Sequence, residues 1–252
     1  MTRNKVIEAA ATVAESLSST LARYKTRISR GPKLAAACVA ATIADGLVAV
    51  IHVVDSHGQG HAPTLARGMI ESMLDLEMVC TNADYLKPLR LATAQGKIAI
   101  GQQFLSQAKM LTKEQQDAVR ADLREQALIV EDLERQGIKP LSIEEKFMRA
   151  PKSGVLWTYY WHFCSSAHND LRALASRHLR GNHIILGETL SDDDVRETLV
   201  ICAGIALNVY EYIPTFLMVT AEQLQPEWEP LGPLLRRLAG APTKFQRIRN
   251  DC

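Results

Sequence analysis

The sequence predicts an all-α protein built as a single-domain bundle of several helices. Apolar residues recur at steps of three and four along most of the chain, which is typical of helices that bury one face. The 252 residues include only 14 glycines and 10 prolines, and no stretch shows the apolar–polar alternation of a β-hairpin. Hydrophobic residues make up 47% of the chain, which is enough for a sizeable core and excludes a disordered protein.

Periodicity, glycine and proline define the first three helices. An amphipathic helix that carries Val6 is expected to end near Pro32. A second helix from Leu34 is broken by residues 56–61, which hold two glycines and no apolar side chain. Pro63 begins a third helix, because a proline in the first turn removes an N–H that has no partner within the helix.

Two capping boxes mark the starts of helices in the middle of the chain. Residues 86–110 first continue the helical pattern beyond the third helix. Thr112 and Gln115 then have the spacing of a capping box, which opens a charged and therefore solvated helix. Ser142 and Glu145 repeat this spacing and open a short helix.

The last part of the chain holds an aromatic helix and a long acidic-capped helix. The aromatic helix is expected over residues 155–180. Ser191 and the three aspartates after it begin a helix that reaches about Leu224, because negative charge favours the positive end of the helix dipole. We expect one all-helical domain over residues 1–225 and a proline-containing basic tail with one short helix over residues 226–252.

Net charge and hydropathy give expectations for the partners and the location of the protein. The net charge is +1, so no bulk attraction supports nucleic-acid binding, although a local basic patch would allow it. Residues 34–54 are long enough to span a membrane, but Asp45 at the midpoint costs about 2.5–3.5 kcal/mol there. We expect a buried core helix, no membrane contact, a cytoplasmic location and reduced thiols for the five cysteines.

Arg67 and Glu71 are the first candidate site residues. They lie four apart on the third helix, at the edge of its broad apolar arc, where they can form an ion pair. One interpretation is a half-buried pair that fixes the register of two helices, since each charge needs the other away from water. The other interpretation is a catalytic or ligand-binding pair.

Ser165 and His168 are the second pair of candidates. They lie three apart on the apolar side of the aromatic helix, close enough to form a hydrogen bond. His168 could transfer protons near physiological pH, and Ser165 could act as a nucleophile or orient the imidazole. Alternatively, His168 is a histidine of the helix interface without a chemical role. No third residue that orients the imidazole can be named, so a catalytic triad is not supported.

We expect neither a metal nor a cofactor. His52, Asp55, His57 and His61 offer suitable ligand atoms, but no two of them have a recognised metal-binding spacing. The sequence contains no glycine-rich phosphate loop and no C-x-x-C motif.

Three stretches resemble a family. Residues 55–62 form a glycine-bearing break, residues 65–71 read Leu-x-Arg-x-x-x-Glu, and residues 159–168 carry Tyr…Ser-x-x-His. This order is similar to a bacterial family known only as a domain of unknown function, and the resemblance covers about residues 34–179. The resemblance implies an all-helical domain and no established activity. It also implies that four side chains converge: Arg67, Glu71, Ser165 and His168.

Two functions follow as hypotheses. In the first, the protein is a small hydrolase or nuclease-like enzyme, for example in bacterial defence: Arg67 holds an anionic group, Glu71 orients Arg67, and His168 transfers protons with Ser165 nearby. Ser166 leaves the choice between the two hydroxyls open. In the second, the protein is a non-catalytic interaction module that binds a protein partner or a second copy of itself, and the polar residues are structural.

Overall fold

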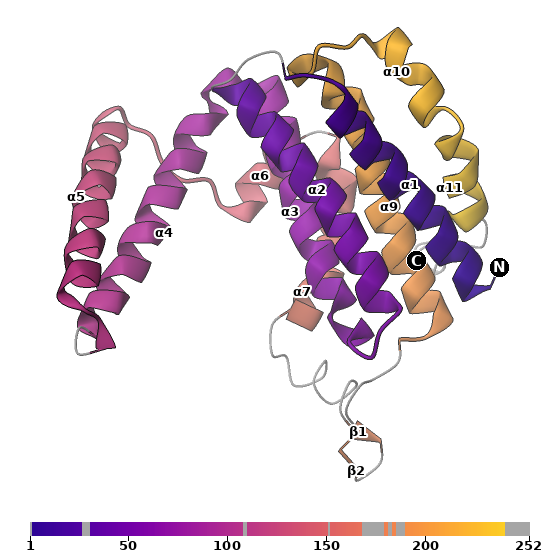
Figure 1. The fold of residues 1–252 in the computed structure, drawn as a ribbon, viewed down its shortest axis with the longest axis horizontal. Coiled ribbons are helices and arrows are strands. Elements are labelled where there is room, and N and C mark those ends of the chain that lie inside the picture. The colour runs from indigo at the N-terminus through magenta and orange to yellow at the C-terminus, as the bar shows by residue number, and fades with distance from the viewer. Residues whose placement is uncertain are drawn as a thin grey trace. The chain divides into compact units, whose positions relative to one another are not determined.

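The computed structural model describes residues 2–26, 31–107, 110–150, 152–167, 179–180, 183–184 and 190–239. Within these ranges helices dominate, so the predicted all-α, multi-helix class is confirmed (Figure 1). In chain order the elements are α1 (Arg3–Arg23), α2 (Pro32–Val54), the 3-10 helix η1 (Gln59–His61), α3 (Ala62–Thr81), η2 (Ala83–Tyr85), α4 (Leu86–Ser106), α5 (Lys113–Arg135), α6 (Ile143–Arg149), η4 (Ser153–Leu156), α7 (Trp157–Ala167), the paired strands β1 (Leu179–Arg180) and β2 (His183–Ile184), α9 (Asp192–Phe216), α10 (Ala221–Trp228) and α11 (Leu231–Ala239).

The chain forms two compact units. The first unit comprises Met1–Cys80 and Ala150–Cys252, and the second comprises Thr81–Arg149. The expectation of one domain over residues 1–225 with a tail over residues 226–252 stays a prediction.

The core of the first unit is built on α1, α2 and α9, which pack against one another. Their facing side chains are largely aliphatic, as the three- and four-residue spacing predicts. Helix α3 packs against α2 where the side chain of Met69 meets Gly46, and a Cβ on Gly46 would lie 2.8 Å from Cγ of Met69. The largest fully buried residues of the first unit include Leu17, Ile43, Leu47, Ile70, Leu76, Leu199 and Phe216.

The C-terminal helices differ from the expectation. The predicted helix up to Leu224 is wrong, because α9 ends at Phe216 and the chain becomes extended. Leu217 forms an isolated bridge with Thr26, and the N–H of Met218 donates to the carbonyl of Lys25 at 2.8 Å. Thr220 then caps a new helix, α10. Pairing with a segment almost 200 residues away therefore overrides the local helical pattern.

Among the described residues, two helices, α2 and α9, are long and apolar enough by length and composition to cross a membrane. Within the apolar 18-residue stretch of each helix, 33% is buried in α2 and 61% is buried in α9. Core helices of soluble proteins pass the same test, so these features assign no location.

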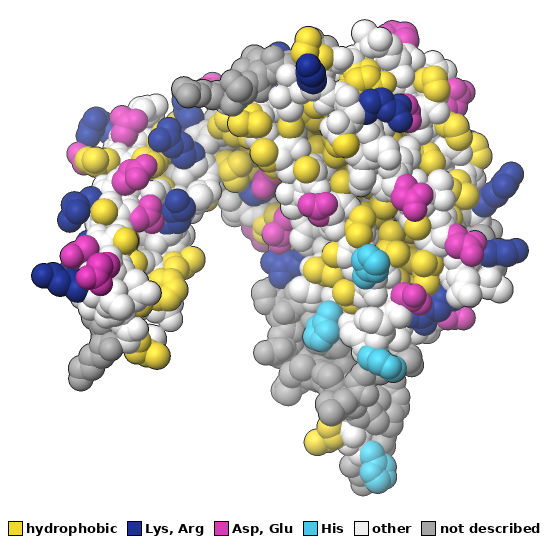
Figure 2. All heavy atoms as spheres, in the orientation of Figure 1, with side chains coloured by type: hydrophobic (Ala, Val, Ile, Leu, Met, Phe, Trp, Pro, Cys, Tyr) yellow, Lys and Arg dark blue, Asp and Glu magenta, His cyan; other side chains and the backbone are white. Residues whose placement is uncertain are grey.

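The second unit is a hairpin of the helices α4 and α5, which lie side by side (Figure 1), followed by α6. The helices run antiparallel, because the amide of Gln95 donates to Glu134 while Gly101 lies opposite Leu123. Both predicted capping boxes are confirmed. At α5, Thr112 and Gln115 bond reciprocally, and Ser142 and Glu145 do the same at α6. Figure 2 shows acidic and basic side chains interspersed over the visible face of this unit.

Candidate functional site

Helix α3 places Arg67 and Glu71 at the edge of a buried surface. Pro63 lies in its first turn as predicted, and most of the following apolar side chains are buried in the core. The side chain of Arg67 is 23% exposed and that of Glu71 is 39% exposed. Both charges therefore sit at the boundary between the core and solvent, as the helical wheel predicts.

Helix α7 packs its aromatic run beside these two residues. Tyr160 and Phe163 are buried, at 4% and 1% exposure, whereas Trp161 is 51% exposed. The Trp161 ring meets Trp157 edge-on, with 5.5 Å between centroids, and meets Tyr160 in the same way at 6.2 Å. Edge-to-face contacts of this kind restrict the orientation of an aromatic ring.

The start of this segment is fixed by a buried carboxylate on α3. Glu77 is 1% exposed and accepts hydrogen bonds from the backbone N–H groups of Lys152 and Ser153, both at 3.0 Å. The hydroxyl of Ser153 donates to the same carboxylate at 2.6 Å. Because these donors open η4, which runs directly into α7, Glu77 helps set where α7 begins relative to α3.

Arg67, Glu71 and Tyr160 form a closed triangle of hydrogen bonds. Nε of Arg67 donates to Oε1 of Glu71 at 3.0 Å, and Nη2 of Arg67 donates to the hydroxyl of Tyr160 at 3.3 Å. That hydroxyl in turn donates to Oε1 of Glu71 at 3.2 Å. The guanidinium also lies over the Tyr160 ring, 5.3 Å from its centroid, which adds a cation–π contact. The pair expected from the sequence therefore has a third member on α7.

The environment keeps the Tyr160 phenol neutral. Burial raises the pKa of Tyr160 to about 12, and a hydrogen bond with Cys164 and the charge of Glu71 act in the same direction. The positive charge of Arg67 opposes this rise in the pKa. At neutral pH the hydroxyl therefore keeps its proton and can donate to Glu71 while it accepts from Arg67.

Of the second pair of candidates, the structure describes only Ser165. Ser165 is exposed, and its hydroxyl donates to the carbonyl of His162 on its own helix at 2.8 Å. His168 and the side chain of Ser166 lie outside the described residues. The convergence of Ser165 and His168 with Arg67 and Glu71 stays a prediction, and so does the choice between the two hydroxyls.

Tyr160 is the residue of this cluster that the sequence did not single out. It lies on the same side of α7 as Trp157, Trp161 and Cys164, where an aromatic residue is expected to be core. The hydroxyl of Tyr160 is the feature of the sequence that could have indicated its role, because a tyrosine placed among apolar residues usually needs a hydrogen-bond partner there.

In the described part of the chain, no group of three or more His, Cys, Asp or Glu side chains lies close enough to hold a metal ion. The described chemistry of the site is that of a fixed cation, a carboxylate and a neutral phenol. This set can hold and polarise an anionic group.

Comparison with known families finds one match. A model of a family of unknown function, DUF5677, matches residues 35–183. The chain belongs to the DUF5677 family. The DUF5677 match spans more than half of the chain and includes α3 and α7, so it confirms the resemblance to a family of unknown function. Neither a curated protein nor a solved structure matches the chain.

Proposed function

We propose that the protein is a hydrolase of phosphate esters with nuclease-like activity, and that the seam between α3 and α7 is its active site. The observation that carries the proposal is the way Arg67 is held. Glu71 accepts from its Nε and Tyr160 accepts from its Nη2, while 23% of the side chain stays in contact with solvent. A guanidinium fixed in this way is prepared to stabilise charge that develops on a phosphate.

The roles divide between the two helices. Arg67 binds the phosphate, since a planar guanidinium matches its oxygens in a bidentate manner. Glu71 and Tyr160 are positioning residues that restrict the rotamer of Arg67. His168 transfers the proton and Ser165 lies nearby as a nucleophile or an orienting hydroxyl, as the Ser-x-x-His spacing indicates.

The half-exposed indole of Trp161 supports a nucleotide as the substrate. It touches the ring of Tyr160, and that ring lies under the guanidinium of Arg67. A base stacked on Trp161 would place a phosphate within reach of Arg67, and proteins commonly bind single strands through stacked aromatics and nearby cations. Such a local site needs no basic surface, which agrees with the net charge of +1.

The proposal is tested with the purified full-length protein on bis-nitrophenyl phosphate and on labelled single-stranded RNA and DNA. His168→Ala should abolish hydrolysis while the melting temperature changes by less than about 2 °C. Arg67→Met should also abolish it. His162→Ala is the matched control, because His162 is an exposed histidine six residues earlier in the chain. Absence of hydrolysis by the wild type, or full activity of His168→Ala, contradicts the proposal.

A non-catalytic interaction module is the second candidate. It is favoured by the closed bonding of Arg67, Glu71 and Tyr160, which by itself links α3 to α7. The exposed Ile100 and Phe104 of α4, at 58% and 53%, also favour a protein partner or a second copy of the chain. Under this alternative, Arg67→Met destabilises the fold by about 1–3 kcal/mol and removes no chemical step.

We also propose that the protein acts in the cytoplasm. The exposed Asp45 in the middle of α2 supports this location, since a charged side chain is costly inside a membrane. Cell fractionation tests it: recovery in the membrane pellet after a high-salt wash contradicts it.

A further inference from the structure

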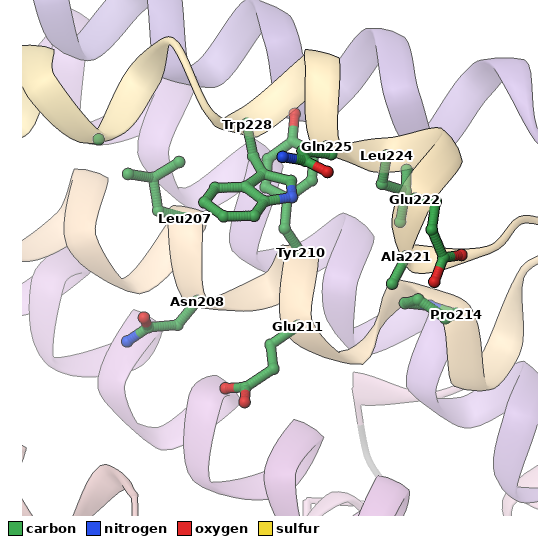
Figure 3. Close-up of a pocket in the computed structure, with 11 residues that line it drawn as sticks. Leu207, Asn208, Tyr210, Glu211, Pro214, Ala221, Glu222, Leu224, Gln225 and Trp228 are labelled. Atoms are coloured by element: carbon green, nitrogen blue, oxygen red, sulfur yellow. The ribbon is translucent and has the colours of Figure 1, made fainter.

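The first unit also has a pocket formed by α9, α10 and α11. It is a cavity of about 600 Å³ that is open to solvent, shown in Figure 3. Small-molecule sites typically occupy about 300–1,000 Å³. Leu207, Tyr210 and Pro214 line the α9 wall at the three- and four-residue spacing of one helix face.

The cavity follows from incomplete packing of a short helix. The residue of α10 nearest Pro214 in the view is the small Ala221, whereas Trp228 at the other end of α10 is large (Figure 3). The indole of Trp228 is 42% exposed although it is an apolar wall of the cavity. An aromatic surface left open beside a cavity is available to a ligand that has an apolar body.

The polar groups around the cavity are mostly occupied. The hydroxyl of Tyr210 is bonded to Ser16 at 2.8 Å and Thr20 at 3.2 Å, so this residue offers its ring. Glu211 is paired with Lys152. In the described part of the chain, the carboxylate of Glu222 has no such basic partner.

Glu222 is negatively charged and lies at one end of the cavity. It occupies the first turn of α10, where hydrogen bonds from its own backbone N–H and from Thr220 lower the pKa of its carboxyl group. In Figure 3 it lies on the Pro214 side, while Trp228 lies on the Leu207 side. Since Leu207 and Pro214 are seven residues apart on α9, these two ends are separated by about 10 Å along the helix axis.

We propose that this cavity binds a small organic amine, with an apolar ring or chain against Trp228 and its ammonium group at Glu222. The described lining contains no lysine or arginine, and of its two carboxylates Glu211 is paired with Lys152, so Glu222 is the one available to a cation. Because Arg236 lies 3.7 Å from where a Cβ on Gly232 would stand, like-charge repulsion disfavours the α11 wall as the place of the ammonium group. The site is independent of the proposed hydrolase activity.

Isothermal titration with two probes of opposite charge tests the proposal. Phenylbutylamine carries an ammonium group, and phenylbutyrate carries a carboxylate on a body of the same shape. The amine should bind saturably below about 1 mM, and the acid should bind at least about tenfold more weakly. Equal binding of the two probes, or no saturable binding of the amine up to about 5 mM, overturns the proposal.

Variants locate the binding site. Trp228→Ala and Glu222→Gln should each weaken amine binding by about tenfold. Trp161→Ala controls for the loss of an exposed indole elsewhere in the unit. Glu114→Gln controls for the loss of a carboxylate at the equivalent capping position of α5, where Thr112 plays the part of Thr220.

A further variant covers the case in which Trp228→Ala fails to fold. Leu207→Lys introduces a positive charge on the α9 wall and leaves the α10 packing residues in place, so it should abolish amine binding. Unchanged binding in the folded cavity variants, or equal loss in the two controls, contradicts the assignment.

Discussion

The hydroxyl of Tyr160 lies 3.2 Å from Oε1 of Glu71. This hydrogen bond joins α7 to α3 through two residues that are 89 positions apart in the chain. Arg67 closes the triangle by donating to both partners. Each of the three polar side chains therefore forms hydrogen bonds with the other two at the edge of the core. This arrangement makes the seam of α3 and α7 sensitive to single substitutions and to alkaline pH.

Tyr160→Phe should lower the stability at neutral pH by about 1 kcal/mol. The variant keeps the ring but removes the hydroxyl that accepts from Nη2 of Arg67 and donates to Glu71. One such hydrogen bond typically contributes about 0.5–1.5 kcal/mol. Urea unfolding followed by circular dichroism measures the change. A free energy of unfolding equal to that of the wild type contradicts it.

The same variant should alter the pH dependence of stability. The pKa of Tyr160 is about 12 in the folded chain, whereas an unfolded tyrosine titrates near 10. Between these values the unfolded chain releases a proton that the folded chain keeps. The free energy of unfolding therefore falls as the pH rises, by up to about 1.4 kcal/mol per pH unit from this residue. This contribution is fully present below about pH 10 and is lost as the pH approaches about 12.

Urea titrations from about pH 9 to about pH 12 check this dependence. Tyr160→Phe should lose stability less steeply than the wild type over that interval. Burial also raises the pKa of Tyr210 and Tyr212, but both proteins share these residues, so their effect cancels in the comparison. Parallel slopes for the two proteins would show that Tyr160 titrates normally.

Removal of the Glu77 carboxylate should be more damaging than removal of one of its partners. Ser153→Ala removes only the 2.6 Å bond from the Ser153 hydroxyl and should cost about 1 kcal/mol. Glu77→Ala leaves this hydroxyl and two backbone N–H groups without their acceptor and opens a small cavity, so it should cost about 3 kcal/mol. Differential denaturant unfolding of the two variants gives the order, and the reverse order contradicts the role of Glu77.

Two glycines of α4 should respond with opposite signs to replacement by alanine. A Cβ on Gly101 would lie 2.8 Å from Cδ2 and 3.1 Å from Cγ of Leu123, so Gly101→Ala forces the Leu123 side chain out of its place between α4 and α5 and should destabilise by about 1 kcal/mol net. A Cβ on Gly96 would meet nothing within 4 Å. Gly96→Ala should therefore stabilise the helix by about 0.5–1 kcal/mol. Thermal unfolding measures both, and equal signs would show that the helices do not approach closely at Gly101.

Trp161 should report nucleotide binding by fluorescence. If a base stacks on its half-exposed indole, a single-stranded oligonucleotide should quench the emission of the wild type. Trp161→Ala should lose most of this quenching and bind about tenfold more weakly. Trp228→Ala is the control, since its indole is 42% exposed at the other cavity. Equal loss of quenching and affinity in the two variants contradicts a stacking role for Trp161.

The sequence by itself determined the all-α class and the starts of several helices. Capping at Thr112, Ser142 and Ser191 depends on hydrogen bonds that reach only three residues along the chain. The position of Arg67 and Glu71 at the edge of an apolar face depends equally on the pitch of one helix. Such local relationships can be read directly from residue spacing.

The tertiary structure alone decided which helices meet and where the local pattern is overridden. Tyr160 reaches Glu71, Glu77 accepts from Lys152 and Ser153, and Leu217 leaves the helical pattern to pair with Thr26. In each case the partner is at least 75 residues distant in sequence. No spacing rule encodes such a pairing, because it results from how apolar helix faces fit together when the whole chain packs.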